Sequence, residues 1–115
     1  MEFGLWVKAL AVAEVTASVE DPTLRYALQI QDRIAKTIKY PLRERELGMS
    51  GHVKLRLHLF RDGTLGRALI AESSGIESFD LEALKAAESQ APYPPFPSVI
   101  PQQDLWLELP VLFRS

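Results

Sequence analysis

Few side chains in this sequence could hold a metal ion or take part in acid–base chemistry. His52 and His58 are the two histidines, and both fall in one predicted strand. At roughly 3.3 Å per residue of extended chain they stand about 20 Å apart, too far to share a metal ion. Both lie on the polar face of that strand, which predicts solvated side chains. We expect neither a metal site nor a cofactor.

Motifs that accompany catalysis are also missing. Ser73-Ser74-Gly75 is not a nucleophile elbow, in which glycines flank the serine on both sides, and it indicates a turn. Asp80, Glu82 and Glu88 lie in a predicted helix, where carboxylates are usually solvated. The chain has no cysteine, which excludes disulfides and thiol catalysis, and no glycine-rich phosphate loop. The sequence therefore predicts a binding domain and not an enzyme.

Length, composition and charge narrow the class of protein further. A chain of 115 residues with 47% apolar and 24% charged residues fits one globular domain with one core. The net charge of −2 argues against a nucleic-acid partner, because such domains carry a concentrated basic surface. No stretch approaches the roughly 20 apolar residues that span a bilayer. Glu2 and Lys8 argue against a signal peptide.

Two strands and a tight turn are expected in the middle of the chain. Apolar and polar residues alternate over residues 53–59, which predicts a strand with one buried face. Asp62-Gly63 follows and is a strong hairpin signal, because glycine readily adopts the positive φ of such turns. The returning strand covers residues 64–72, where Leu65 is out of phase with the later apolar residues. A bulge at Gly66-Arg67 would restore the pattern.

A helix is expected on each side of this hairpin. Asp21 can cap the first helix, Pro22 suits its first position, and Pro41 ends it near Lys39. Ser78 is the expected N-cap of the second helix, and residues 43–46 are expected to be solvated and paired with one another. Each helix has one apolar face. The first consists of Tyr26, Ile30, Ile34 and Ile38, and the second of Phe79, Ala83, Leu84, Ala87 and Ala91.

The last strand is predicted over residues 105–113, where apolar side chains again alternate. Pro110 has no N–H to donate, so it predicts an edge strand that is open on one side. A right-handed crossover from the second strand then gives the spatial order 2-1-3 for three antiparallel strands. The fold class is α+β, a two-layer sandwich with two helices on one face of a three-stranded sheet. This domain is expected to cover residues 21–115.

Two segments allow more than one interpretation. The prolines between residues 92 and 101 stiffen the return loop, with Tyr93 and Phe96 covering one end of the core, or they form a polyproline ligand. Residues 1–20 are expected to be an N-terminal extension. Its first half suits a helical stripe, whereas the alternation from Ala13 onward suits a strand.

Several short motifs resemble the C-terminal domain of the TonB family of energy transducers over residues 24–114. In chain order they are Tyr40-Pro41, Gly51-x-Val53, Asp62-Gly63, Ser73-Ser74-Gly75, Phe79-Asp80-x-x-Ala83-Leu84, the proline-rich return loop and Pro110-Val111-Leu112-Phe113. The resemblance implies a periplasmic, non-catalytic module that grips the TonB box, a short peptide of outer-membrane TonB-dependent receptors. It also implies an inner-membrane complex of the ExbB and ExbD type, reached through an N-terminal anchor that these residues lack. That complex would supply energy from the proton gradient.

The resemblance also implies where the peptide lies. An extended peptide can add a strand to an open sheet edge, and backbone pairing tolerates many peptide sequences. The implied contact residues are Leu105, Trp106, Leu107, Glu108, Leu109, Val111 and Phe113 along the last strand, with Thr37, Lys39, Tyr40 and Pro41 near one end.

Two alternatives and one hypothesis stay open. A C-terminal domain of the TolA type has a similar layout but serves envelope integrity. The chain could instead self-associate, or form a homodimer by strand exchange, with Trp106 and Leu112 on the outer face of its edge strand. Glu14-Val15-Thr16-Ala17 resembles the core of a TonB box, and we hypothesise that it pairs with an edge strand of its own or a neighbouring chain.

Overall fold

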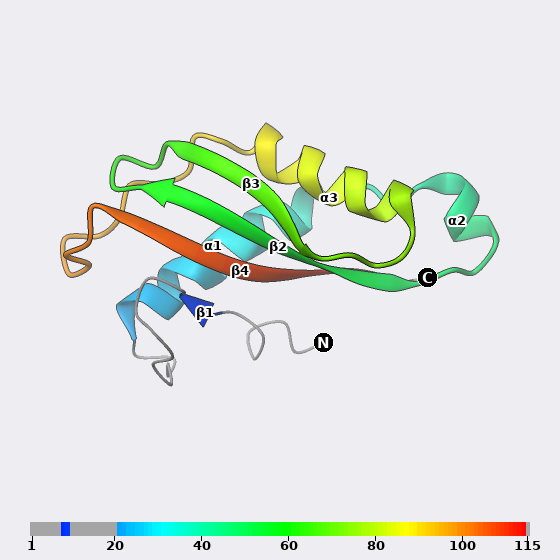
Figure 1. Cartoon of the computed structure of the whole chain (residues 1–115), viewed down its shortest axis with the longest axis horizontal. Coiled ribbons are helices and arrows are strands. Elements are labelled where there is room, and N and C mark those ends of the chain that lie inside the picture. Colours follow the sequence, from blue (N-terminus) through cyan, green and yellow to red (C-terminus); the bar gives the residue numbers. More distant parts are fainter. Residues whose placement is uncertain (1–7, 10–20, 115) are drawn as a thin grey trace.

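The computed structural model describes residues 8–9 and 21–114 (Figure 1). The elements are β1 (Lys8–Ala9), α1 (Pro22–Thr37), α2 (Leu42–Glu46), β2 (Gly51–Phe60), β3 (Leu65–Glu72), α3 (Glu77–Ser89) and β4 (Asp104–Phe113). The strands form one sheet in the order β1-β4-β2-β3, and neighbouring strands are antiparallel. The order predicted for the three long strands is confirmed.

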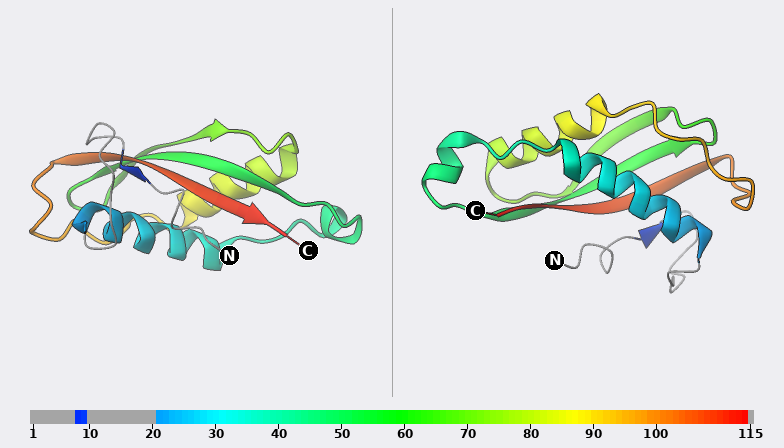
Figure 2. Two further views of the ribbon diagram at one scale, coloured as in Figure 1. Left: turned by 90° about the horizontal axis from the view of Figure 1, so that it is seen from below. Right: turned by 180° about the vertical axis from the view of Figure 1, so that it is seen from behind.

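α1 and α3 cover the same face of the sheet, α1 against β4 and α3 against β2 and β3 (Figure 2). The core between the two layers is made by alternate strand residues and by the apolar faces of the helices. Burying one large apolar side chain contributes about 1.5–3 kcal/mol, so this core dominates the stability of the fold. The predicted two-layer α+β architecture is confirmed. Its fully buried large residues include Tyr26, Ile30, Ile34, Leu55, Leu57, Leu59, Phe79, Leu105, Leu107, Leu109 and Phe113.

α1 begins as its sequence predicts. The Asp21 carboxylate accepts hydrogen bonds from the N–H groups of Thr23 at 2.8 Å and Leu24 at 3.3 Å, and Pro22 is the first helical residue. The helix ends at Thr37, two residues before the predicted end, because the backbone of Ile38 is extended with ψ at 136°. In the described ranges, no helix is long and apolar enough to cross a membrane.

The hairpin between β2 and β3 has the predicted turn and the predicted bulge. Gly63 adopts a φ of +92°, which side chains disfavour. Arg67 pairs with His58 and Leu65 pairs with Leu59, so Gly66 is the extra residue of the bulge. The bulge keeps the apolar residues on both sides of Gly66 in register with the core.

One local expectation in the connections is wrong. α3 begins at Glu77 with Ile76 as N-cap, and the expected cap Ser78 lies inside the helix. Residues 43–46 are largely exposed, as expected, and they form most of the short helix α2. α2 begins directly after Pro41, whose fixed φ of −58° suits a helix start.

The return loop after α3 closes one end of the core. Tyr93 and Phe96 are 3% and 5% exposed, as expected for side chains that cover the core. The ring of Phe96 meets Tyr26 of α1 edge to face, with centroids 5.0 Å apart. Because both aromatic rings of the loop are buried, they are not presented to a partner that recognises polyproline segments.

Candidate peptide-binding edge

The outer edge of β4 presents backbone groups at every second residue. Just beyond the paired strands the N–H of Arg61 donates to the carbonyl of Gln103 at 2.9 Å, so residue 103 turns toward the β2 side. Successive residues of a strand turn opposite ways, and the β2–β4 register is unbroken. The backbone groups that face the outer edge are therefore those of Asp104, Trp106, Glu108, Pro110 and Leu112.

Pro110 interrupts this row of groups in the middle. It has no N–H, and its carbonyl accepts a hydrogen bond of 3.2 Å from the side-chain amide of Gln31. Gln31 is a buried residue of α1, 5% exposed, so the helix satisfies a carbonyl that would otherwise face a new strand. The sequence predicted that Pro110 lies on an edge strand. It could not predict the hydrogen bond to Gln31, because the two residues are 79 positions apart and no local pattern links them.

The expectation that the whole edge of β4 is open is wrong at its centre. Lys8 of β1 pairs with Glu108, and Ala9 pairs with Leu107, in antiparallel register. Because the backbone of Glu108 faces outward, Lys8–Glu108 is the hydrogen-bonded pair of this short ladder. The strand-like alternation in the sequence starts at Ala13, and the segment 14–17 that resembles a TonB box lies outside the described residues.

The carboxylate of Glu108 lies on the open face of the sheet, which is the face that α1 and α3 do not cover. Its side chain is only 8% exposed, and Oε2 lies 2.6 Å from Nη2 of Arg56 on β2. A buried carboxylate needs such a partner, since an unpaired buried charge is strongly unfavourable. This pair fixes the outer face of β4 at the point where β1 joins the sheet.

Aromatic rings gather where β4 ends. Phe79 of α3 stacks on Phe113 with centroids 4.3 Å apart, and the ring of Tyr40 meets both edge to face. The hydroxyl of Tyr40 is buried and has no hydrogen-bond partner among the described residues. Such a group is costly unless a ligand or an ordered water molecule satisfies it. The predicted site residues Tyr40 and Phe113 are thus brought together.

The segment next to Tyr40 is fixed by α3. The N–H of Lys39 donates to the Glu82 carboxylate at 2.8 Å, a role that the helix pattern of Glu82 did not indicate. The hydroxyl of Thr37 donates to the carbonyl of Arg33 at 2.9 Å, so it is already used within α1. Pro41 follows as the N-cap of α2.

The other predicted site residues of β4 fall into two groups. Trp106 and Glu108 lie on the open face with outward-turned backbone groups. The side chains of Leu105, Leu107, Leu109, Val111 and Phe113 lie in the core, and their backbone groups face β2. A peptide on the outer edge would therefore make no direct contact with the side chains or backbone hydrogen-bonding groups of this second set. These residues would support binding only by holding β4 in place.

His58 is less solvated than the sequence predicts. His58 stacks on Trp106 with centroids 4.4 Å apart and rings nearly parallel, and its Nε2 lies 2.6 Å from the Asp104 carboxylate. Its side chain is 19% exposed. His52 instead lies 3.2 Å from the Glu72 carboxylate. In the described part of the chain, no three His, Cys, Asp or Glu side chains gather as metal ligands.

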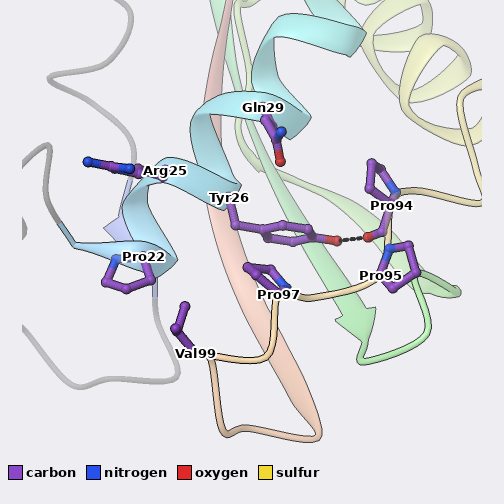
Figure 3. A pocket seen from close by; sticks show the side chains of 8 residues that line it. All are labelled: Pro22, Arg25, Tyr26, Gln29, Pro94, Pro95, Pro97 and Val99. Atoms are coloured by element: carbon purple, nitrogen blue, oxygen red, sulfur yellow. Dashed lines mark hydrogen bonds between the residues drawn. The ribbon is translucent and has the colours of Figure 1, made fainter.

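Away from the β4 edge, a concave region lies between the start of α1 and the return loop (Figure 3). This hollow of about 820 Å³ is lined by Pro22, Arg25, Tyr26, Gln29, Pro94, Pro95, Pro97 and Val99. The hydroxyl of Tyr26 donates to the carbonyl of Pro94 at 2.7 Å. Burial raises the pKa of Tyr26 to about 12, against a smaller opposite effect of Arg33, so this phenol stays neutral and its contact is structural.

Comparison with known proteins places these features in a family. The model of the family described as Gram-negative bacterial TonB protein C-terminal matches residues 36–115. Protein TonB of Pasteurella multocida is 33% identical over 94 residues, which are 82% of this chain and 36% of that protein. The chain therefore spans little more than a third of the length of this relative.

Solved structures share the fold. Two solution structures of the Helicobacter pylori TonB C-terminal domain give TM-scores of 0.68 and 0.62 at 18% and 23% identity. They cover 88% and 76% of this chain, and 97% and 91% of their own chains. The HasB C-terminal domain gives a TM-score of 0.50 at 20% identity, with 88% of both chains covered. The family match over most of the chain and the identity to a TonB protein show that this chain belongs to the TonB C-terminal domain family.

Proposed function

We propose that this domain binds the TonB box of an outer-membrane transporter by accepting it as an added strand on the outer edge of β4. The TonB C-terminal domain family is a family of non-catalytic interaction domains in energy transduction, which supports a binding role. The proposed contact is made mainly by backbone groups. One such domain can then serve several transporters whose peptides differ in sequence.

The observation that carries this proposal lies at the end of β4. The backbone groups of Leu112 face outward, and none of the described strands pairs with them on that side. The ring of Tyr40 meets the neighbouring Phe113 edge to face, and its buried hydroxyl lacks a partner among the described residues. An added strand would satisfy the backbone groups of Leu112, and a polar atom of the same peptide would satisfy the Tyr40 hydroxyl.

The interruption at Pro110 limits how the peptide pairs. At that position a new strand finds no N–H, and the carbonyl is already bonded to Gln31. The peptide therefore makes its backbone hydrogen bonds at Leu112 on one side of Pro110 and at Glu108 and Trp106 on the other. A short ladder of this kind gives modest affinity, which suits a contact that must form and break repeatedly.

The proposal extends to the rest of the transducer. The domain would stand in the periplasm, joined through a preceding anchor to an inner-membrane complex of the ExbB and ExbD type. That complex would draw on the proton gradient and pass its energy to the transporter as a pull on the bound peptide. Since the chain spans only 36% of its TonB relative, such partners would be engaged by regions outside these residues.

An amide NMR titration with a synthetic ten-residue TonB-box peptide tests the binding mode. We expect saturable shifts at Trp106, Glu108 and Leu112 and around Tyr40. No shift at millimolar peptide would contradict the proposal. In that case an edge already protected by a second copy would indicate a closed dimer, and a free edge would favour a TolA-like role.

Substitution of Leu112 separates backbone pairing from side-chain contact. Leu112→Pro removes the outward N–H without removing a hydrogen bond to β2, and should weaken peptide binding about fivefold, from roughly 1 kcal/mol per hydrogen bond. Leu112→Ala keeps the N–H and should lose clearly less affinity. Equal losses in the two variants, measured by isothermal titration calorimetry, would show that the side chain and not the strand edge binds the peptide.

A further inference from the structure

The chain supplies a strand of its own to the edge that the proposed ligand would use. β1 lies along the outer side of β4, next to the first half of α1, in all the views of Figures 1 and 2. It pairs with β4 at Glu108 and Leu107 and also contacts α1. The outward N–H and carbonyl of Glu108 are therefore engaged by Lys8, whereas those of Leu112 are not engaged by any described strand.

We infer that β1 is an intramolecular competitor for the peptide site: it occupies the edge at Glu108 and must leave before an incoming strand can pair there. This inference rests on the proposed function, because it concerns the same edge of β4. The strand that occupies the edge of β4 at Glu108 is thus β1 of the same chain.

The short connection between β1 and α1 determines the strength of the competition. Only residues 10–20 separate Ala9 from Asp21, the N-cap of α1. A segment held by so short a connection acts at an effective concentration of about a millimolar or more. A free peptide must therefore compete with a local strand, and its apparent affinity falls by the fraction of molecules in which the edge is open.

The small size of β1 keeps this competition reversible. Its described part contributes two residues to the sheet, whereas strands in globular proteins usually contain about five or six. A peptide that reaches from Trp106 to Leu112 can make more backbone hydrogen bonds than β1 makes. Binding of the peptide therefore releases the N-terminal segment, whereas a peptide that pairs only at Glu108 gains little over it.

A pair of substitutions at Lys8 tests the competition in the full chain. Lys8→Pro removes the N–H that faces Glu108, and Lys8→Ala is the matched control because it loses the same charge but keeps the N–H. We expect Lys8→Pro to bind the synthetic TonB-box peptide at least about threefold more tightly than Lys8→Ala. Equal affinities of the two variants would overturn the inference. Binding by neither variant nor the wild type would overturn the proposed function.

Hydrogen exchange without peptide tests the pairing independently of the proposed function. The outward amide of Glu108 should exchange at least about threefold faster in Lys8→Pro than in Lys8→Ala, while the inward amide of Leu109 stays equally protected in both. Equal exchange at Glu108 in the two variants would show that β1 does not protect this edge.

A reversible crosslink provides the opposite test. In a directly opposite hydrogen-bonded pair the Cα atoms lie about 5.5 Å apart, within the range of a disulfide. The chain has no cysteine, so Lys8→Cys/Glu108→Cys introduces the sole thiol pair. Oxidation should weaken peptide binding by about tenfold or more, and reduction should restore it. Once the disulfide has formed, unchanged peptide binding after oxidation would overturn the competition.

Discussion

The two ends of the three-stranded sheet are closed in different ways. At the hairpin end, defined by residues 60–64 and the return loop, backbone groups join directly: the N–H of Tyr93 donates to Gly63 and that of Phe96 donates to Arg61, both at 2.9 Å. At the aromatic end, defined by Tyr40, Phe79 and Phe113, rings pack against one another instead.

The difference separates a structural junction from a surface suited to binding. Arg61 at the hairpin end donates to the carbonyls of Ile100 and Gln102, so even its guanidinium is used within the fold. The aromatic end leaves the buried hydroxyl of Tyr40 without a partner among the described residues and lies beside the outward-facing backbone of Leu112. Gln102 at the hairpin end also has a buried side-chain oxygen without a partner among the described residues, so the aromatic end is distinguished by the outward-facing backbone beside it.

The largest expected effect is at the hairpin end. In Gly63→Ala the new Cβ would lie 1.9 Å from the carbonyl oxygen of Tyr93, and φ would remain at +92°. We expect a loss of about 3 kcal/mol or more in the free energy of unfolding, from the backbone penalty and the clash together. Urea denaturation measures this loss.

Gly75 provides the matched control near the other end. Its φ of +84° is similar, but a Cβ there would meet no atom of the described residues within 4 Å. Gly75→Ala should therefore cost only the backbone penalty of about 1–2 kcal/mol. Equal losses at the two glycines would contradict the view that the hairpin end is a tight backbone junction.

The second effect concerns the turn that leads into α3. The Asp80 carboxylate accepts hydrogen bonds from the Ser73 hydroxyl and from Ser74, whose N–H lies 3.0 Å away and whose hydroxyl lies 2.8 Å away. Asp80→Asn should lower the free energy of unfolding by about 1 kcal/mol near neutral pH. Glu77→Gln, in the same first turn but outside this contact, should cost less.

The effect of Asp80 should also depend on pH. Burial alone would raise the pKa of Asp80, but the hydrogen bonds from Ser73 and Ser74 outweigh it and hold the pKa below its ordinary value. Its stabilisation is therefore fully present above the unfolded pKa of about 3.9 and is lost as the pH falls through the lower folded value. The stability difference between wild type and Asp80→Asn should shrink below about pH 4. A difference that stays constant down to pH 2 would contradict this assignment.

The smallest effect on stability is expected at the aromatic end. Tyr40→Phe removes a hydroxyl that has no partner among the described residues, so stability should stay equal or rise by up to about 1 kcal/mol. Peptide binding should weaken, because the proposed ligand loses a hydrogen bond. Calorimetry with the TonB-box peptide and thermal unfolding measure the two changes.

Tyr26→Phe is the control for a tyrosine hydroxyl that is already used. Its contact with the carbonyl of Pro94 is 2.7 Å long, and its loss should cost about 1 kcal/mol of stability while peptide binding is retained. If Tyr40→Phe destabilised the domain as much as Tyr26→Phe, the hydroxyl of Tyr40 would have a partner in the folded state. Its assignment to the ligand would then be wrong.

Local patterns predicted most of the fold. The cap Asp21 followed by Pro22, the hairpin residues Asp62-Gly63 and the alternation over residues 105–113 each determine a nearby backbone conformation. The bulge at Gly66 was predictable because a single extra residue shifts the phase of a strand. Ser78 misled because its type and position suit a cap, whereas the helix already begins at Glu77.

The details of the edge were harder to predict, because they depend on contacts between distant segments. Neither Gln31 nor Pro110 carries a local signal that one will bond to the other. The sequence suggested a helical stripe for the first half of the N-terminal extension and strand pairing for residues 14–17, so the closure of the edge at Glu108 by Lys8–Ala9 was not predicted. The family resemblance implied which strand a peptide would use, but it did not indicate which backbone groups of that strand face outward.

The bond between Gln31 and Pro110 also bears on how the domain behaves at high concentration. An uninterrupted strand edge lets copies of a protein pair edge to edge through backbone hydrogen bonds, which leads to aggregation. A proline that cannot donate, with its carbonyl taken by a helix of the same molecule, leaves a gap in the middle of the β4 edge. Short peptides can still use either side of this gap, whereas long runs of regular pairing between copies are cut in two.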